Sequence, residues 1–475
     1  MQGNIKLIAK IQLWREKAKE RSKIIAYLRK WIIAIIASRE MWRNRYYNMR
    51  KERDELAKEL KLLKQGGVTK IKHHSYTAEQ IGLCLQLRHE GGCSYRSCVK
   101  VLMIVSNIYG FGWSKPSPSS VRDWDIKFGY DKVHQVNEQP KEYVLITDES
   151  VSIGSQKLLL FLGVESEKYQ FEKALTIEQV EVLDIRLKES WKGPEISESI
   201  QAINRRNFVF KYSCNDNGGN LRNALNISNL IHIEDCGHAL GNILKRKYKK
   251  DEIFLSFSAE LTKFKRQIFP SKFAEYSPPK QRTKGRFMNL SSICKWAIFA
   301  LQLTQQYEHQ KEHKEIFSKL KWLLTYTEFI ERLNKEQRLI DAVNKILKNT
   351  GLSKGTLEEC KTIILESEVD QAIQNQIKDY LNRNLNKINQ IKKIICSSDI
   401  IESIFGSFKQ KLCSNPQAGM TPGCLTIANY GRKIIPAEIK EAMQRTRIVD
   451  IHEWRKKNLP ISVLQKKKML VKSVG

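Results

Sequence analysis

Two apolar stretches that each end in an aspartate decide the fold of this chain: residues 143–148 read YVLITD, and residues 208–216 read FVFKYSCND. Both are rich in β-branched and aromatic residues, which predicts two strands. A third stretch, residues 400–409, reads IIESIFGSFK, and its apolar residues recur at helical spacing. The sequence therefore places two carboxylates at strand ends and one, Glu402, on a helix.

Residues 141–250 alternate between strand and helix patterns. We expect strands near 143–147, 157–164, 178–186, 208–213 and 230–233, and helices near 194–206, 220–227 and 238–248. This order is that of an RNase H-like fold, in which the first and fourth strands are neighbours. The fold would bring Asp148 and Asp216 side by side.

The remaining segments predict an α+β multidomain chain, in which a helical insertion interrupts an RNase H-like mixed sheet with helices. The expected parts are a basic helical, coiled-coil-like segment (1–67), a helix-turn-helix domain (76–135), the first part of the catalytic core (141–250), an all-helical insertion (251–395), the last core helix (396–430) and a basic C-terminal tail (431–475). In the first segment, 18 Lys and Arg stand against 7 Asp and Glu, and Leu56, Leu60 and Leu63 fall at helical spacing. These leucines fit a short coiled coil or a packed helix.

Composition narrows the range of partners. The chain has 475 residues, of which 41% are apolar, so a substantial core can form. Lys and Arg total 82 against 51 Asp and Glu, which gives a formal charge of +31. Such a surplus favours a polyanionic partner, and nucleic acid is the commonest.

No membrane or metal-finger pattern stands out. The apolar run of residues 31–37 is far shorter than the roughly 20 residues of a spanning helix. No secretory signal is visible, so we expect a cytoplasmic protein. The ten cysteines include no Cys-x2-Cys pair. Cys84, Cys93, Cys98 and His89 could be drawn as a zinc set, but small core residues explain these cysteines better.

The three carboxylates suggest a site for two Mg²⁺ or Mn²⁺ ions. Magnesium is a hard cation that prefers carboxylate oxygens and keeps several waters. Two such ions can activate a water or a 3′-hydroxyl and stabilise the leaving oxygen of a phosphodiester. In this arrangement Asp148 bridges both ions, while Asp216 holds one and Glu402 holds the other.

Each assignment has an alternative. Glu149 could replace Asp148, although successive strand residues point to opposite faces and only one of them can face the site. Asp216 could belong to an ordinary turn. Glu402 could form a capping box with Asp399. Lys409 and Lys411 lie one to two turns along the same helix, where they suit contact with a phosphate backbone.

The helix-turn-helix domain offers candidate DNA contacts. Residues 77–80 read TAEQ, a capping box, and Ser117-Pro118 provides an N-cap and first-turn proline for a third helix of residues 119–128, ended by Gly129. The expected contacts with a groove or phosphates are Ser119, Ser120, Arg122, Asp123 and Lys127. Trp124 and Phe128 are expected to pack inward. A helical bundle without DNA contact is the alternative.

The constellation resembles the DDE/D transposases, RNase H-like enzymes of bacterial insertion sequences and other DNA transposons. Glu402 and Lys409 match the E-x6-K spacing of bacterial members, but Ile395 and Ser398 stand where a Tyr and an Arg often precede the glutamate. Residues 235–238, DCGH, are similar to the C/D-x2-H motif of hAT-like transposases.

The resemblance implies an enzyme that binds the terminal inverted repeats of its element, cleaves the strands and joins them to target DNA. It implies two Mg²⁺ or Mn²⁺ ions, double-stranded DNA as partner, a homo-oligomer and a nucleoid-associated location. It also places His238 near the active site, makes Asp235 a rival second ligand and suggests that Trp296 contacts DNA; packing within a helix is the alternative for Trp296 and His238. The alternative functions are an inactive DNA-binding relative and a nuclease that cuts without joining.

Overall fold

The computed structural model divides the chain into two compact units, Met1–Thr69 and Lys70–Gly475. The described residues are 2–65, 71–72, 74–149, 156–166, 173–281, 287, 290–388, 391–411, 419–431, 434–461, 466–467, 469 and 471, without the side chains of 2–13, 58–65 and 411. Among them, no helix is both long enough and apolar enough to cross a lipid bilayer.

The first unit is a single helix, α1, Gln2–Gln65. At 1.5 Å per residue its 64 residues extend over about 96 Å. Residues 4–65 contain no glycine or proline, so no residue breaks the hydrogen-bond ladder. Every side chain from residue 14 to residue 57 is exposed. The helix therefore has no hydrophobic core of its own.

The second unit begins with three helices: α2, Ala78–His89; α3, Tyr95–Tyr109; and α4, Pro118–Val133. The predicted caps are present: the Thr77 hydroxyl accepts the Gln80 N–H at 3.3 Å, and the Ser117 hydroxyl accepts the Ser120 N–H at 3.0 Å. Trp124 and Phe128 are buried, as expected.

Gly129 does not end α4, contrary to the sequence prediction. A Cβ at this position would lie 2.0 Å from the Leu425 carbonyl oxygen. Leu425 belongs to a 3-10 helix, η6, Pro422–Asn429. The glycine therefore permits the close approach of η6 to α4 and has no breaking function here.

Residues 431–475 are not simply a basic tail, which corrects that prediction. The described part of this segment includes α15, Pro436–Arg445, and α16, Ile448–Asn458. Ile439 and Ala442 of α15 are fully buried in the same apolar cluster as residues of α2, α3 and α4. The chain thus returns to cover its front helices.

The centre of the second unit is a five-stranded mixed sheet in the order β3-β2-β1-β4-β5. The strands are β1, Lys141–Glu149; β2, Lys157–Glu165; β3, Glu181–Lys188; β4, Phe208–Asn215; and β5, His232–Glu234. Neighbours β1–β2 and β2–β3 are antiparallel, whereas β1–β4 and β4–β5 are parallel. This order and these directions confirm the α+β class and the RNase H-like sheet.

Both faces of β1 are buried, which explains its continuous apolar sequence. Tyr143 and Leu145 share one cluster with α5, Gly193–Asn204, and α6, Gly219–Ile227. Val144 and Ile146 share the other cluster with α7, Cys236–Tyr248, and α14, Asp399–Lys411. The side chains that alternate along the strand thus fill two separate cores.

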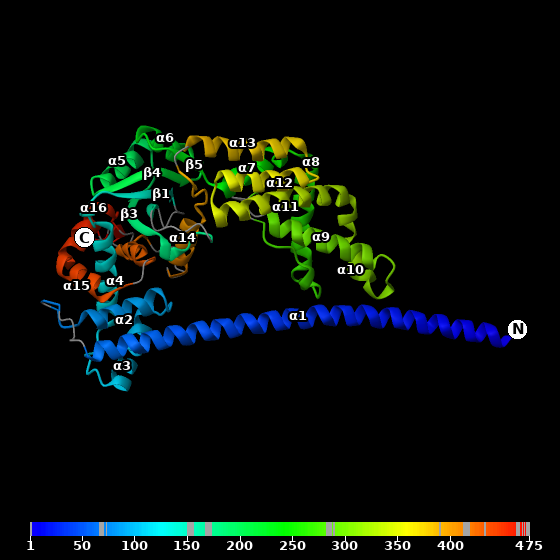
Figure 1. Ribbon diagram of the computed structural model, residues 1–475, viewed down its shortest axis with the longest axis horizontal. Helices are drawn as coiled ribbons and strands as arrows, with labels where there is room; N and C mark the ends of the chain where they lie inside the picture. The colour runs from blue at the N-terminus through cyan, green and yellow to red at the C-terminus, as the bar shows by residue number, and fades with distance from the viewer. Residues whose placement is uncertain are drawn as a thin grey trace. The chain divides into compact units, whose positions relative to one another are not determined.

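Between α7 and α14 lies a helical region, drawn green to yellow in Figure 1. Its helices are α8, Glu252–Ile268; α9, Leu290–Tyr307; α10, Lys314–Leu320; α11, Thr327–Thr350; α12, Lys354–Glu366; and α13, Gln371–Lys387. Within the described part of residues 251–395, the only β pairing is an isolated bridge between Leu352 and Ile394. The region separates Asp216 from Glu402 in sequence.

Candidate active site

Asp148 and Asp216 lie at the carboxyl ends of two neighbouring parallel strands. Ile146 of β1 pairs with Cys214 of β4. Asp148 and Asp216 each come two residues after a member of this pair. The carboxyl ends of parallel strands open at the same edge of the sheet, where α/β folds place their ligands. Both carboxylates are half-buried.

The environment of Asp148 disfavours its charge. Burial raises the pKa of its carboxyl to about 7, and the negative charges of Asp216 and Glu402 add to the effect. The Glu149 N–H, which donates to Asp148 Oδ1 at 2.7 Å, and the His238 ring oppose it. Asp216 and Glu402 are therefore both close enough to Asp148 for their charges to act on it.

Glu402 reaches this region from α14, which contacts β1. Its carboxylate is largely exposed, and its Oε1 lies 3.8 Å from His238 Nε2. Asp399 at the start of α14 forms an ion pair with Lys348 of α11 and thereby fixes the first turn. Asp399 is thus engaged by the insertion.

His238 supplies a positive charge among the carboxylates. The Glu402 carboxylate beside it raises the pKa of its ring to about 9, with further contributions from the charges of Asp235 and Asp216 that outweigh burial. The ring sits in the first turn of α7, directly after β5. It is a half-exposed partner of Glu402 and not a packed core histidine.

Lys409 lies seven residues, or two turns, after Glu402 on the same helix face. Burial lowers the pKa of its ammonium, whereas the charges of Asp148 and Glu402 raise it. Lys409 is therefore a second cation beside the carboxylates. The side chain of Lys411 lies outside the described residues.

Asp235 is fully buried, and its oxygens are used inside the protein. Oδ1 accepts the His238 N–H at 2.8 Å as the N-cap of α7, and Oδ2 accepts the Ser398 N–H at 2.6 Å and the Ser398 hydroxyl at 3.0 Å. These contacts join α7 to the segment before α14. The structure therefore corrects the view of Asp235 as a rival metal ligand, because it positions the two helices instead.

Replacing Asp235 by alanine should lower the free energy of unfolding by about 2–3 kcal/mol, because it removes an N-cap and leaves buried donors of Ser398 without an acceptor. Urea denaturation monitored by circular dichroism measures the change. The half-buried N-cap variant Ser353→Ala, at the start of α12, serves as a control with a loss of about 1 kcal/mol. An equal loss in both variants would contradict the role of Asp235 in joining α7 to the segment before α14.

Glu149 does not face the site. Its Oε2 lies 3.2 Å from Lys157 Nζ on the neighbouring strand. Because side chains alternate along a strand, this contact places Glu149 away from Asp148. Asp148 is thus the β1 carboxylate beside Asp216 and Glu402.

The carboxylates of Asp148, Asp216 and Glu402 suit a divalent cation, although their oxygens do not converge on a single position. In the described part of the chain, no group of three His, Cys, Asp or Glu side chains is close enough to hold a metal ion. However, burial and the negative charges of Asp216 and Glu402 raise the pKa of Asp148, and a bound cation would offset both effects. Carboxylate oxygens are the ligands that Mg²⁺ and Mn²⁺ prefer.

The predicted DNA contacts on α4 divide into exposed and buried residues. Ser119 and Arg122 are exposed; Arg122 pairs with Asp123 at 3.0 Å. Ser120 is half-buried, and its hydroxyl bonds to Ser117 Oγ at 2.9 Å. Lys127 is buried. The structure corrects its assignment, because burial lowers the pKa of an ammonium that is no longer at the surface.

Trp296 packs within the insertion. Its indole N–H donates to the Tyr276 carbonyl at 3.1 Å, and its ring lies 5.9 Å from that of Phe264. This arrangement supports the packing alternative, since the one polar atom of the side chain is already bonded.

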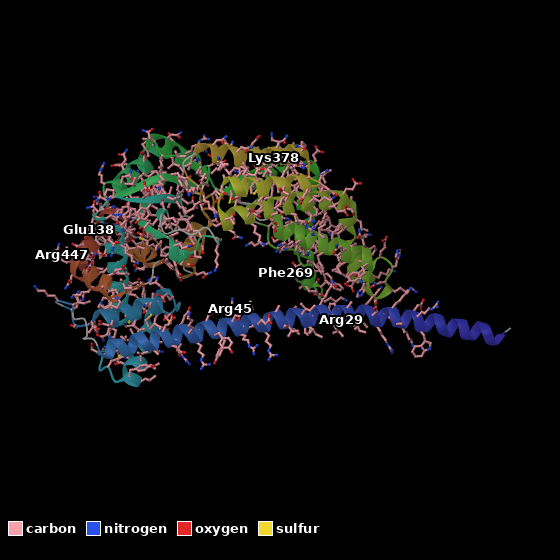
Figure 2. The ribbon with its side chains drawn as sticks, viewed as in Figure 1. Arg29, Arg45, Glu138, Phe269, Lys378 and Arg447 are labelled. Carbon is pink, nitrogen blue, oxygen red and sulfur yellow. The ribbon has the colours of Figure 1, made fainter. Side chains whose placement is uncertain are left out.

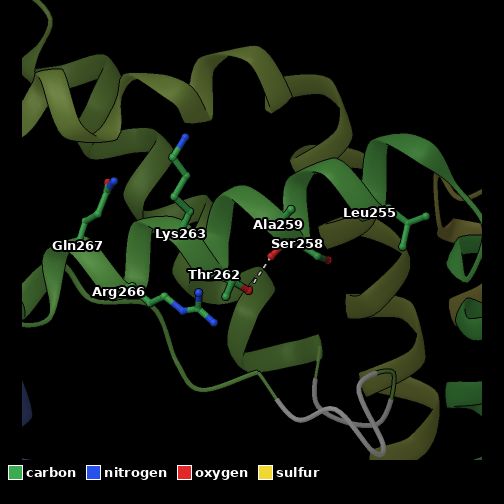
Figure 3. A pocket seen from close by; sticks show the side chains of 7 residues that line it. All are labelled: Leu255, Ser258, Ala259, Thr262, Lys263, Arg266 and Gln267. Atoms are coloured by element: carbon green, nitrogen blue, oxygen red, sulfur yellow. Dashed lines mark hydrogen bonds between the residues drawn. The ribbon is translucent and has the colours of Figure 1, made fainter.

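A second open surface lies on α8 (Figure 3). It is a hollow of ≈ 600 Å³ lined by Leu255, Ser258, Ala259, Thr262, Lys263, Arg266 and Gln267. It offers no carboxylate, histidine or cysteine. Its exposed Lys263 and Arg266 could meet an anion but provide no acid–base chemistry.

Two residues that matter for the site escaped the sequence analysis. Ser398 completes the Asp235 clamp, and Lys348 holds Asp399. Both act across more than fifty residues of sequence. The only available signal was the polar pair Ser397-Ser398 directly before the helix of Glu402.

No protein-family model matches the chain, and no curated protein matches it either. Among solved structures, the chain is similar to the Drosophila P element transposase strand transfer complex, with 12% sequence identity and a TM-score of 0.39 over 80% of this chain and 97% of that one. At this identity and score, the similarity assigns neither a family nor a function.

Proposed function

We propose that this chain is a DDE transposase that cleaves DNA strands with divalent cations and transfers the resulting 3′ ends to target DNA. The observation that carries the proposal is that Asp148 and Asp216 follow neighbouring parallel strands at one edge of an RNase H-like sheet, with Glu402 of α14 near enough for its charge to help raise the pKa of Asp148. The carboxylates come from β1, the end of β4, and α14, and the clamp at Asp235 holds α14 in place.

The residues divide the chemistry between them. Asp148, Asp216 and Glu402 would hold two Mg²⁺ or Mn²⁺ ions, which supply activation of the attacking oxygen and stabilisation of the leaving oxygen. His238 orients the Glu402 carboxylate through their contact. Lys409 stands two turns further on and offers its ammonium to the DNA backbone as a point charge.

Double-stranded DNA suits the charge of the chain. A formal charge of +31 favours binding to phosphates by release of counterions. Ser119 and Arg122 at the exposed start of α4 are the proposed contacts of the front helices with the element ends. Two ends must be held together for transfer, so the proposal includes a homo-oligomer.

A cleavage and strand-transfer assay tests the proposal. The substrate is DNA that spans the flanks of the gene, incubated with Mg²⁺ or Mn²⁺ and with wild type or the variants Asp216→Asn and Glu402→Gln. We expect cut and joined products from wild type only. Glu149→Gln is the matched control, because that carboxylate adjoins the site without facing it.

The other outcomes select between functions. Cleavage without joined products would identify a nuclease. Binding of the flanks without any cleavage would identify an inactive DNA-binding relative. A chelator such as EDTA must abolish cleavage if the carboxylates act through divalent cations.

A further inference from the structure

The long helix α1 exposes many large apolar side chains on one seam. Exposed fractions are 62% for Trp14, 50% for Ile25, 53% for Ile32, 49% for Ile35 and 59% for Trp42. Figure 2 shows the side chains along α1, with Arg29 and Arg45 labelled. Apolar side chains of this size and number call for a partner surface.

Nine of the sixteen large apolar side chains that α1 exposes between residues 14 and 57 follow a seven-residue repeat. Positions 14, 21, 28, 35, 42 and 49 carry W, R, L, I, W and M, and the sequence continues the column with Leu7, Leu56 and Leu63. A second column, three residues before the first, carries A, I, I, R, Y and R at positions 18, 25, 32, 39, 46 and 53. Two such columns are the a and d positions of a coiled coil.

We propose that α1 forms an antiparallel two-stranded coiled coil with a second copy of this chain, in which residue positions facing each other sum to 67. This pairing overlaps the whole of α1, because its first and last residues, Gln2 and Gln65, also sum to 67. Ile32 then faces Ile35 of the second copy, and Ile25 faces Trp42.

The arginines on the seam determine the direction. Arg21, Arg39 and Arg53 occupy core positions. In a parallel, in-register pair each would face its own copy, which stacks three layers of like charge in the core.

The antiparallel pairing removes all three repulsions. Arg39 faces Leu28, whereas Arg21 faces Tyr46 and Arg53 faces Trp14. A guanidinium over an aromatic ring is a favourable contact. Within α1 itself, Arg45 already lies 5.3 Å from the ring centre of Trp42.

The arginines also determine the register. A shift by one heptad to a sum of 60 places Arg39 against Arg21, and a shift to a sum of 74 places Arg53 against Arg21. The flanking positions, which pair at sums of 69 and 65 on either side of this core, are mixed, since Lys17 lies opposite Glu52 but Arg15 lies opposite Arg50. The core arginines therefore select the pairing that sums to 67.

Disulfide trapping in the full-length protein tests orientation and register. Ile25→Cys and Trp42→Cys are prepared as separate variants, and wild type controls for the native cysteines. Under mild oxidation, we expect a crosslinked dimer above background only when the two variants are mixed. Crosslinking of Ile25→Cys with itself would indicate a parallel pair and overturn the orientation. Absence of crosslinking in every combination would overturn the pairing with a second copy.

Light scattering tests the seam without oxidation. Ile35→Glu introduces a charge on the seam, whereas Ile33→Glu introduces the same charge outside the two columns; both isoleucines are exposed, at 49% and 65%. We expect Ile35→Glu to lose the α1-mediated association and Ile33→Glu to keep the mass of wild type. Equal masses for the two variants would overturn the seam. The measurement needs no DNA, so its result is independent of the proposed catalytic function.

Discussion

Asp148→Asn should slow metal-dependent cleavage severely and, at the same time, stabilise the metal-free protein above pH 7. The amide retains the shape of the side chain but cannot replace a carboxylate that bridges two cations. A loss of about 4 kcal/mol of transition-state stabilisation slows cleavage roughly 10³-fold. The rate of DNA cleavage measured with excess enzyme reports this change.

The gain in stability follows from the pKa of Asp148. Burial, with the charges of Asp216 and Glu402, raises that pKa from 3.8 to about 7. A raised pKa means that the stabilising contribution is complete below pH 3.8 and is lost as the pH rises to about 7. The ionised carboxylate then costs on the order of 3–4 kcal/mol, which asparagine avoids.

Urea denaturation in EDTA at pH 8 and pH 5 measures the stability difference between Asp148→Asn and wild type. The advantage of the variant should be largest at pH 8 and shrink at pH 5. When Mg²⁺ replaces EDTA, the stability of wild type should rise and that of Asp148→Asn should stay nearly unchanged. The control Glu149→Gln should show neither the gain nor the loss of cleavage. A variant that is no more stable than wild type at pH 8 would contradict the crowding of charge at this site.

The sheet could be predicted because its strands are buried on both faces. Continuous apolar runs such as residues 143–147 leave little doubt about strand identity, and the order of elements fixes which strands are neighbours. The proximity of Asp148 and Asp216 follows from that order alone. The position of Glu402 could not be predicted from the order of the strands, because it depends on contacts between α14, α7 and α11.

Some helices and contacts could not be predicted because charged residues masked the apolar pattern of the same segment. The basic runs after residue 430 concealed the buried stripe of Ile439, Ala442 and Met443, which has the spacing of an amphipathic helix. In α1, the arginines at core positions interrupt the heptads, so that only Leu56, Leu60 and Leu63 stood out. Lys127 is a residue type that often contacts DNA, but here it is buried on α4, against which α16 packs.

Asp125→Ala should destabilise the protein by about 3–5 kcal/mol, because it removes one partner of a buried ion pair. Asp125 is fully buried on α4. Its carboxylate lies 2.6 Å from His89 Nε2 and accepts hydrogen bonds from the Tyr95 hydroxyl at 2.8 Å and the Asn429 amide at 2.7 Å. The substitution removes this acceptor from His89 and Tyr95, whereas the Asn429 amide keeps its bond to the Asp125 backbone carbonyl at 2.7 Å.

The pKa of Asp125 also indicates that its ionised carboxylate stabilises the folded protein. Burial would raise it, but the charge of His89 and the hydrogen bonds from His89, Asn429 and Tyr95 outweigh burial and lower the pKa below 3.8. A lowered pKa contributes stability above the unfolded value of about 3.9, and this contribution is lost as the pH falls through the folded pKa. The difference between wild type and Asp125→Ala should therefore be full at pH 7 and diminish below pH 4.

Thermal and urea denaturation of Asp125→Ala and the matched control Asp123→Ala test the network. Asp123 is two residues away on the same helix, but its side chain is 40% exposed and pairs with the neighbouring Arg122. The control should change stability by about 0.5 kcal/mol or less. Because Asn429 belongs to η6, which follows the Glu402 helix, the network joins the front helices to the end of the catalytic core. Equal stabilities of the two variants would show that these parts of the protein hold together without Asp125.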